Sequence, residues 1–145
     1  MSLNLDSLGW SVAEGATDEY DFQVRFRRFV EKPPTTEYNQ RLNIFWTMKD
    51  PLDTGFANKS ELDKLHDFEN RLIDAVENDE FSIMTMVLTG RGEREFVFYT
   101  SDPQKFLERL TNMPQEQEPY PLEIQCNEDP EWEYYYDEIG TIKNV

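Results

Sequence analysis

Polar and apolar residues alternate near the N-terminus of the chain. Over residues 21–27 apolar and polar residues alternate, which is the period of a strand with one buried face. Gly15 lies in a turn between this segment and an earlier one around Trp10. We therefore predict a β-hairpin over residues 8–30, which the sequence Lys-Pro-Pro-Thr at 32–35 ends. The apolar positions of its second strand are Phe22, Val24 and Phe26.

The rest of the chain alternates between strand-like and helix-like patterns. Apolar residues two apart predict strands, and apolar residues three and four apart predict helices. From Arg41 onward the order is strand, helix, strand, strand, helix, strand, which is the split βαβ pattern of ferredoxin-like folds. The predicted elements are a strand at 41–49, a helix from Ser60 to about Asn78, strands at 81–89 and 93–100, a helix from Pro103 to Met113, and a strand at 120–126.

This order predicts one α+β domain over residues 1–145. Its core, residues 41–127, is a ferredoxin-like two-layer sandwich (βαββαβ) with both helices on one face of a four-stranded antiparallel sheet. The N-terminal hairpin and a short C-terminal helix are additions to that core. Ser60 is the predicted N-cap of the first helix, and Asp102 caps the second before Pro103.

The two central strands are apolar on both faces. A sheet that is covered on one side alternates apolar with polar residues, so the second face of these strands must also be covered. The N-terminal hairpin, the C-terminal aromatic segment or another subunit could cover it. The residues that carry this pattern are Ile83, Met84, Met86, Val87, Leu88, Phe96, Val97, Phe98 and Tyr99.

The C-terminal segment, residues 128–139, combines large aromatic rings with carboxylates. No Lys or Arg occurs between Pro114 and Gly140. Solvated acidic tails normally lack aromatic residues, so an ordered element is expected here. We predict a short helix over 131–139, with Asp129 as its cap and Pro130 in its first turn.

The aromatic residues of this predicted helix have the spacing of one helix face. The helix could simply close the core, with its carboxylates exposed. It could also bind a basic partner, because Trp and Tyr are frequent anchor residues in interfaces. The candidate binding residues are Trp132, Tyr135, Tyr136, Glu131 and Asp137.

The net charge of -16 over 145 residues restricts the classes of partner. Such a field repels nucleic acid phosphates and anionic membranes, and it attracts basic protein surfaces. Acidity that serves only solubility is the alternative explanation. Cys126 is the only cysteine, which excludes an intrachain disulfide, and the N-terminal sequence lacks the pattern of a signal peptide. We expect a cytoplasmic protein that binds no nucleic acid directly and no membrane, as a monomer or homodimer.

Glu69 is the most unusual position in the predicted first helix. It falls within the apolar stripe of that helix, where a carboxylate needs a cation or several donors. A salt bridge to Arg25 or Arg94 is the structural interpretation. The functional alternative is a carboxylate with a raised pKa in a cleft between Glu69 and Arg94.

Other motifs for chemistry are weak or missing. His66 is the only histidine, so with a single cysteine it cannot form a zinc site, and no loop has EF-hand spacing. The glycine-containing segment Thr89–Glu93 joins two strands and lacks the Lys-Ser/Thr ending of a phosphate-binding loop. We expect no catalytic residues, no metal and no cofactor.

Several features in order resemble a bacterial family known as domain of unknown function 695. They are Trp10, the Gly55 loop, the Glu69 helix, the Thr89-Gly90 hairpin with Glu95 and Tyr99 on its return strand, and the ending Asp129-Pro130, Trp132 and Tyr135. The resemblance implies no established activity. More distantly, the family is similar to the ribonuclease E regulator B group, acidic ferredoxin-like proteins that bind and inhibit a ribonuclease. This chain lacks the long acidic tail of that group.

Three functions are compatible with these features. The first is a non-catalytic module whose acidic surface binds a basic protein, such as an RNA-processing enzyme. The second is a small-molecule-binding domain or enzyme with a cleft near Glu69 and Arg94. The third is a self-associating structural protein, suggested by the doubly apolar central strands.

Overall fold

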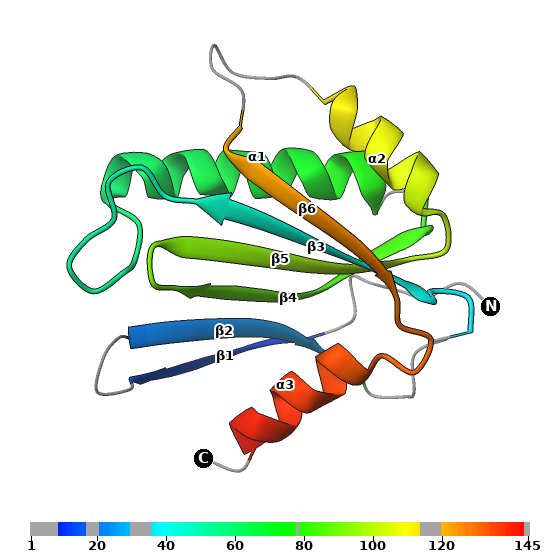
Figure 1. Cartoon of the computed structure of the whole chain (residues 1–145), viewed down its shortest axis with the longest axis horizontal. Helices are drawn as coiled ribbons and strands as arrows, with labels where there is room; N and C mark the ends of the chain where they lie inside the picture. Colours follow the sequence, from blue (N-terminus) through cyan, green and yellow to red (C-terminus); the bar gives the residue numbers. More distant parts are fainter. Residues whose placement is uncertain (1–8, 17–20, 30–35, 78, 114–119, 144–145) are drawn as a thin grey trace.

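Six antiparallel strands form one sheet in the order β1-β2-β4-β5-β3-β6 (Figure 1). The computed structural model describes residues 9–16, 21–29, 36–77, 79–113 and 120–143. The predicted break at residues 32–35 lies outside these residues. The strands are β1 Gly9–Ala16, β2 Asp21–Arg28, β3 Gln40–Thr47, β4 Ser82–Gly90, β5 Glu93–Thr100 and β6 Leu122–Glu128.

Three helices lie on the two faces of this sheet. They are α1 Lys59–Val76, α2 Pro103–Thr111 and α3 Glu133–Lys143. Figure 1 shows α1 and α2 on one side and α3 on the other. The fold is a mixed α and β one with six antiparallel strands and three helices.

The first helix begins earlier than the sequence pattern predicts. Asn58, and not Ser60, is its N-cap, and the Asn58 side chain accepts a hydrogen bond from the backbone N–H of Glu61 at 2.9 Å. The same side chain donates to the carbonyl of Asp50 at 2.7 Å, so it fixes the preceding loop as well. At α2 the prediction is confirmed, because the Asp102 side chain accepts from the N–H of Lys105.

The helix side of the sheet carries the larger apolar core. Phe68 of α1 is fully buried and lies among Trp46, Phe96 and Tyr120, with ring centroids 4.8–5.5 Å apart. Aromatic pairs at these distances stabilise a core beyond their buried area. The cluster consists of Leu42, Ile44, Trp46, Met48, Leu65, Phe68, Leu72, Val76, Phe81, Met84, Val87, Phe96, Phe98, Phe106, Leu110 and Met113.

The N-terminal hairpin is present but does not cover a face of the sheet. Its strand β2 pairs with β4 over Phe22–Phe26, so the hairpin extends the sheet sideways. The predicted four-stranded sheet therefore has six strands. Gly15 was predicted in the turn of the hairpin, but it lies within β1, paired with Phe22. It leaves room for the Phe22 ring, because a Cβ at that position would lie 2.5 Å from this ring.

The second face of the central strands is covered by the C-terminal segment. A smaller apolar cluster lies beneath α3, which satisfies the two-sided pattern of β4 and β5 within one chain. This result selects one of the three predicted covers. The cluster consists of Tyr38, Ile83, Met86, Val97, Tyr99, Trp132 and Tyr135.

Candidate functional site

Asp129 joins the C-terminal segment to the sheet. Its buried carboxylate accepts hydrogen bonds from the Tyr99 hydroxyl at 2.6 Å and from Arg41 at 3.0 Å. It also accepts from the backbone N–H groups of Glu133 at 2.9 Å and Tyr134 at 3.3 Å, at the start of α3. Burial alone would raise the pKa of Asp129, but these donors outweigh it and lower the pKa.

The turn before α3 differs from the predicted helix start. The helix begins at Glu133, so Pro130 is not in its first turn. Trp132 instead has a left-handed backbone with φ of 55°, and its N–H donates to the carbonyl of Asp129 at 3.0 Å. This tight turn places the Trp132 indole against the Tyr99 ring at 4.3 Å, and its Nε1 donates to the carbonyl of Tyr38 at 2.7 Å.

The candidate binding residues fall into two groups. Trp132 and Tyr135 are fully buried, and the Tyr135 hydroxyl donates to the carbonyl of Arg27 at 2.6 Å. These two residues hold α3 on the sheet. Tyr136 is 40% exposed, so it does not share their buried face as predicted. Glu131 and Asp137 are exposed as well.

Beside α3, part of the same sheet face carries clustered carboxylates. Glu95 accepts hydrogen bonds from Asn43 at 2.7 Å and from the Tyr134 hydroxyl at 2.8 Å, which places it on the α3 side of the sheet. Glu93 and Glu123 interact electrostatically with each other, and Glu95 does so with Glu93 and Glu138. We call Glu93, Glu95, Glu123 and Glu138 the acidic face.

The acidic face contains an aromatic residue between two of its carboxylates. Phe45 of β3 pairs directly with Glu95 of β5 on one side and with Glu123 of β6 on the other. Residues directly opposite each other in antiparallel strands point to the same face. The two carboxylates therefore flank the half-buried Phe45, with backbones about 10 Å apart.

Burial and neighbouring carboxylates destabilise the ionised forms of Glu93 and Glu138. Burial raises the pKa of Glu93, and the charges of Glu95 and Glu123 raise it further. Burial raises the pKa of Glu138 too, together with the charges of Glu95 and Asp137. The nearby cation Arg41 is paired with Asp129 and lies over the Tyr134 ring. A cation from outside would relieve this repulsion.

The sequence patterns did not single out the acidic face. Only Glu95 was noted, as part of the family resemblance. The available signal was the period of two that places Glu93 and Glu95 on one face of a strand. Their proximity to Glu123 depends on the strand order, in which β3 lies between β5 and β6.

Glu69 is paired within the fold. Its carboxylate accepts two hydrogen bonds from Arg25, one of them at 3.0 Å. Arg94 is buried and donates from Nε to the Thr89 hydroxyl at 2.9 Å, and burial lowers its pKa while Glu69 opposes that effect. Arg25 is therefore the partner of Glu69, and Arg94 lies nearby as a second positive charge.

A comparison with protein families identifies the chain. The family described as "Family of unknown function (DUF695)" matches residues 9–138. The chain belongs to this family. The matched span contains all four residues of the acidic face. It also contains Asp129 and Trp132, which hold α3 on the sheet. Neither the curated proteins nor the solved structures gave a match to this DUF695 chain.

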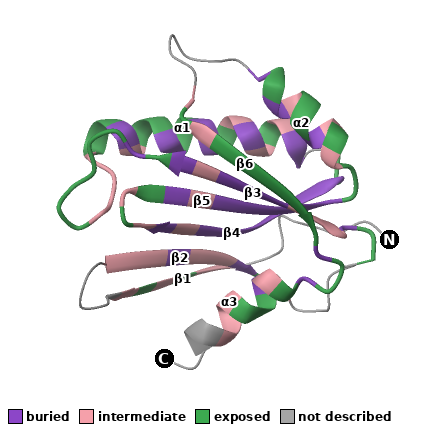
Figure 2. Ribbon diagram, in the orientation of Figure 1, coloured by how far each residue is buried: buried purple, intermediate pink, exposed green. Residues whose placement is uncertain are grey.

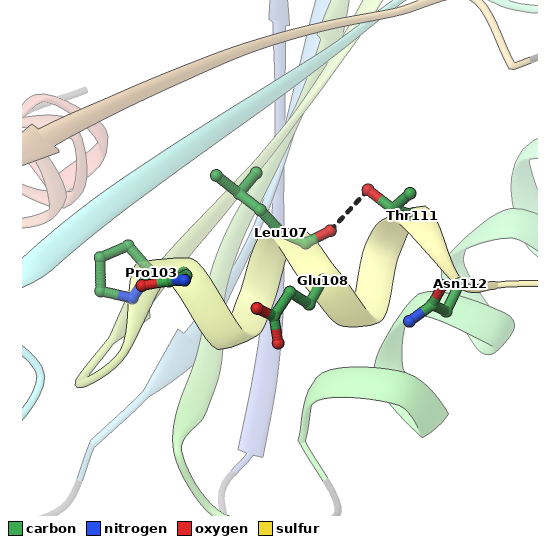
Figure 3. Close-up of a pocket in the computed structure, with 6 residues that line it drawn as sticks. Pro103, Leu107, Glu108, Thr111 and Asn112 are labelled. Atoms are coloured by element: carbon green, nitrogen blue, oxygen red, sulfur yellow. Dashed lines mark hydrogen bonds between the residues drawn. The ribbon is translucent and has the colours of Figure 1, made fainter.

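Neither Glu69 nor Arg94 lines the surface hollow on α2 of this DUF695 chain. Figure 3 shows its lining on α2 and the cap of that helix. Leu107, one of the lining residues, is 38% exposed. The lining comes from α2 and its C-cap alone, whereas ligand sites are usually concave pockets between several elements. The described lining residues are Pro103, Gln104, Leu107, Glu108, Thr111 and Asn112.

The described residues offer neither a metal site nor a membrane-spanning helix. Among them, no group of three or more His, Cys, Asp or Glu side chains could hold a metal ion. His66 is exposed on α1. Among the described helices, none has both the length and the apolar character needed to cross a bilayer.

Proposed function

We propose that this DUF695 protein is a non-catalytic interaction module whose acidic face binds a basic protein surface. The observation that carries the proposal is the row Glu95, Phe45 and Glu123 across three strands, beside Glu93 and Glu138 with raised pKa values. A Lys or Arg side chain from a partner would lie between the two carboxylates and over the aromatic ring. Such contacts combine ion pairing with a cation–π interaction.

The electrostatic cost of the acidic face supports a binding role. The like charges that raise the pKa values of Glu93 and Glu138 oppose folding at pH values above the ordinary carboxyl pKa. In contrast, Glu69, Glu77 and Asp129 each pair with an arginine inside the fold. The carboxylates of the acidic face have no such partner among the described ion pairs, so a basic protein would stabilise them.

We also propose a class of partner for the acidic face. The strand order β4-β5-β3-β6, with α1 and α2 on one side, supports a ferredoxin-like arrangement of the core. That arrangement and the acidic composition support the resemblance to the ribonuclease E regulator B group. A basic RNA-processing enzyme in the cytoplasm is therefore our first candidate partner. The pairing of Glu69 with Arg25 leaves the enzyme hypothesis without a supporting observation.

Octalysine is a suitable probe for this proposal, because it carries charge without a fixed fold. Two variants distinguish binding at the acidic face from attraction by the net charge of the whole chain. The face variant combines Glu93→Gln, Glu123→Gln and Glu138→Gln. The control variant combines Asp63→Asn, Asp67→Asn and Glu108→Gln, which are exposed positions on α1 and α2. Each variant removes three negative charges.

Isothermal titration at low salt should show that wild type and the control variant bind octalysine with similar affinity. The face variant should bind roughly 10- to 100-fold more weakly, because each exposed ion pair contributes about 0.5–1 kcal/mol. Added salt should weaken all three. Equal losses in both variants would show that net charge alone attracts the probe. No wild-type binding would refute the proposed function.

A further inference from the structure

We infer that the free edge of β6 accepts an extended basic segment of the partner as a seventh strand. This inference rests on the proposed function and specifies how the partner binds. Backbone hydrogen bonds would supply affinity, and alternate side chains would supply specificity. The occupant is a strand in which Lys or Arg alternates with apolar residues.

The hydrogen-bond pattern between β3 and β6 shows which backbone groups are free. The N–H of Thr47 donates to Pro121, and the N–H of Asp129 donates to Asn39. In an antiparallel ladder, such pairs alternate with pairs whose backbone groups point away from each other. The register places Ile124 opposite Ile44 and Cys126 opposite Leu42, which are pairs of the second kind.

The backbone N–H and C=O groups of Ile124, Cys126 and Glu128 therefore point to the open edge. Among the described residues, no backbone hydrogen bond from a turn, loop or helix cap involves these groups. Figure 2 shows most of β6 exposed, whereas β4 and most of β5 are buried. This edge is a template for another strand.

Strand β6 is protected against some strands and open to others. Native edges are commonly blocked by charged side chains, Pro or a β-bulge. The sequence of β6 contains neither Lys nor Pro, and its register with β3 is continuous from Leu122 to Glu128. Its charges, Glu123 and Glu128, would repel an acidic strand and attract a basic one, so the edge is open to a basic segment.

The two sides of β6 predict the pattern of the added strand. Glu123 belongs to the acidic face, and Gln125 and Asn127 point to the same side. On the helix side, Ile124 is 37% exposed and Cys126 is exposed. An added strand would thus place basic residues beside Glu123 and apolar residues beside Ile124.

A second copy of this chain is a poor occupant of the edge. Two β6 strands side by side would bring Glu123 and Glu128 of both copies together, each within a chain of charge -16. Like charges that face each other across strands are destabilising. Charge complementarity therefore favours a basic partner over self-association.

The test uses an eight-residue peptide of alternating Lys and Val, together with two backbone N-methylated forms. One form is methylated at every Val and the other at every Lys, so all three peptides carry the same charge. In a strand, alternate residues direct their N–H groups to opposite edges. Only one form should lose binding, by at least tenfold. Loss at Val indicates antiparallel addition, because Val would lie opposite Ile124, and loss at Lys indicates parallel addition.

Amide hydrogen exchange supplies the second readout. The N–H groups of Ile124, Cys126 and Glu128 should become protected when the unmethylated peptide binds. Cys126→Pro removes one of these donors without removing a hydrogen bond to β3, and Pro is tolerated where N–H faces solvent. This variant should bind octalysine like wild type and the Lys-Val peptide at least tenfold more weakly.

Several results would overturn strand addition. These are equal binding of all three peptides, loss in both methylated forms, or binding without protection of the β6 amides. The proposed function would survive each of these results if octalysine binding still depended on the acidic face. Failure of every cationic probe to bind would refute the proposed function itself.

Discussion

The two faces of the sheet are built in different ways. The side covered by α1 and α2 is closed by sixteen buried apolar residues around Phe68. The side of α3 has a cluster of seven, held in place by the hydrogen bonds of Asp129, and beside it lie the uncovered carboxylates of the acidic face. The first face is organised by apolar packing, and the second by polar contacts to one small helix.

The helix side of the sheet supplies stability, and the α3 side contains the surface that we propose for binding. Apolar burial on the helix side supplies most of the driving force for folding. The α3 side gains less from burial and contains carboxylates that repel one another. A surface with unrelieved repulsion is expected where a partner provides the compensating charge. Four changes, from the largest expected effect to the smallest, test this comparison.

Phe68→Ala should have the largest effect, because it removes a buried ring from the helix-side core. We expect the free energy of unfolding to fall by about 3–5 kcal/mol. Urea denaturation measures it. Leu107→Ala on the exposed side of α2 is the control, with an expected change within about 1 kcal/mol. A loss below about 1 kcal/mol for Phe68→Ala would place the main core elsewhere.

Trp132→Phe should weaken the α3 side selectively. The change removes the indole N–H that bonds to the Tyr38 carbonyl and leaves that carbonyl unpaired, at a cost of about 1–3 kcal/mol. Native-state hydrogen exchange should accelerate at Tyr136, whose N–H bonds to Trp132, more than in α1. Equal acceleration in both helices would mean that the two faces are one cooperative unit.

Asp129→Asn should destabilise the protein in a pH-dependent manner. The pKa of Asp129 is lowered by folding, so its ionised form stabilises the native state above the ordinary carboxyl pKa of about 3.9. That contribution is lost as the pH falls through the folded pKa. The variant should be less stable by about 1–3 kcal/mol near pH 7, and the difference should shrink on acidification. Denaturation at several pH values checks this, and a constant difference would contradict it.

Glu93→Gln should have the smallest effect and the opposite sign. The pKa of Glu93 is raised in the fold, so the ionised carboxylate destabilises the native state as the pH rises through that pKa. Removing the charge should stabilise the protein at neutral pH by at most about 0.5 kcal/mol, because the residue is exposed. The gain should vanish in acid. Thermal unfolding at pH 7 and pH 4 measures this change in stability. A variant that is less stable than wild type at pH 7 would contradict the assigned repulsion.

Local patterns in the sequence predicted most of the elements and one buried ion pair. The spacing of apolar residues identified the helices, and Glu69 within an apolar stripe indicated a cation, which the structure identifies as Arg25. The left-handed turn at Trp132 was missed, because it depends on donors from Tyr99 and Arg41 meeting at Asp129. These contacts join distant segments, and no local pattern shows them.

The acidic face was missed for a related reason. Glu95 and Glu123 lie on strands that are separated in sequence by α2, and only the insertion of β3 between them brings both beside Phe45. The aromatic C-terminal residues were a more conspicuous signal. Their burial shows that Trp132 and Tyr135 position α3, while the surface that we propose for binding lies next to them.

The pKa values of Glu93 and Glu138 provide the most direct test of a binding acidic face. Carbon-13 NMR titration of their carboxyl groups measures these values with and without octalysine. Both should be raised in the free protein, and both should fall when the probe is bound, because its ammonium groups favour the ionised carboxylates. Unchanged values at saturating octalysine would contradict the account.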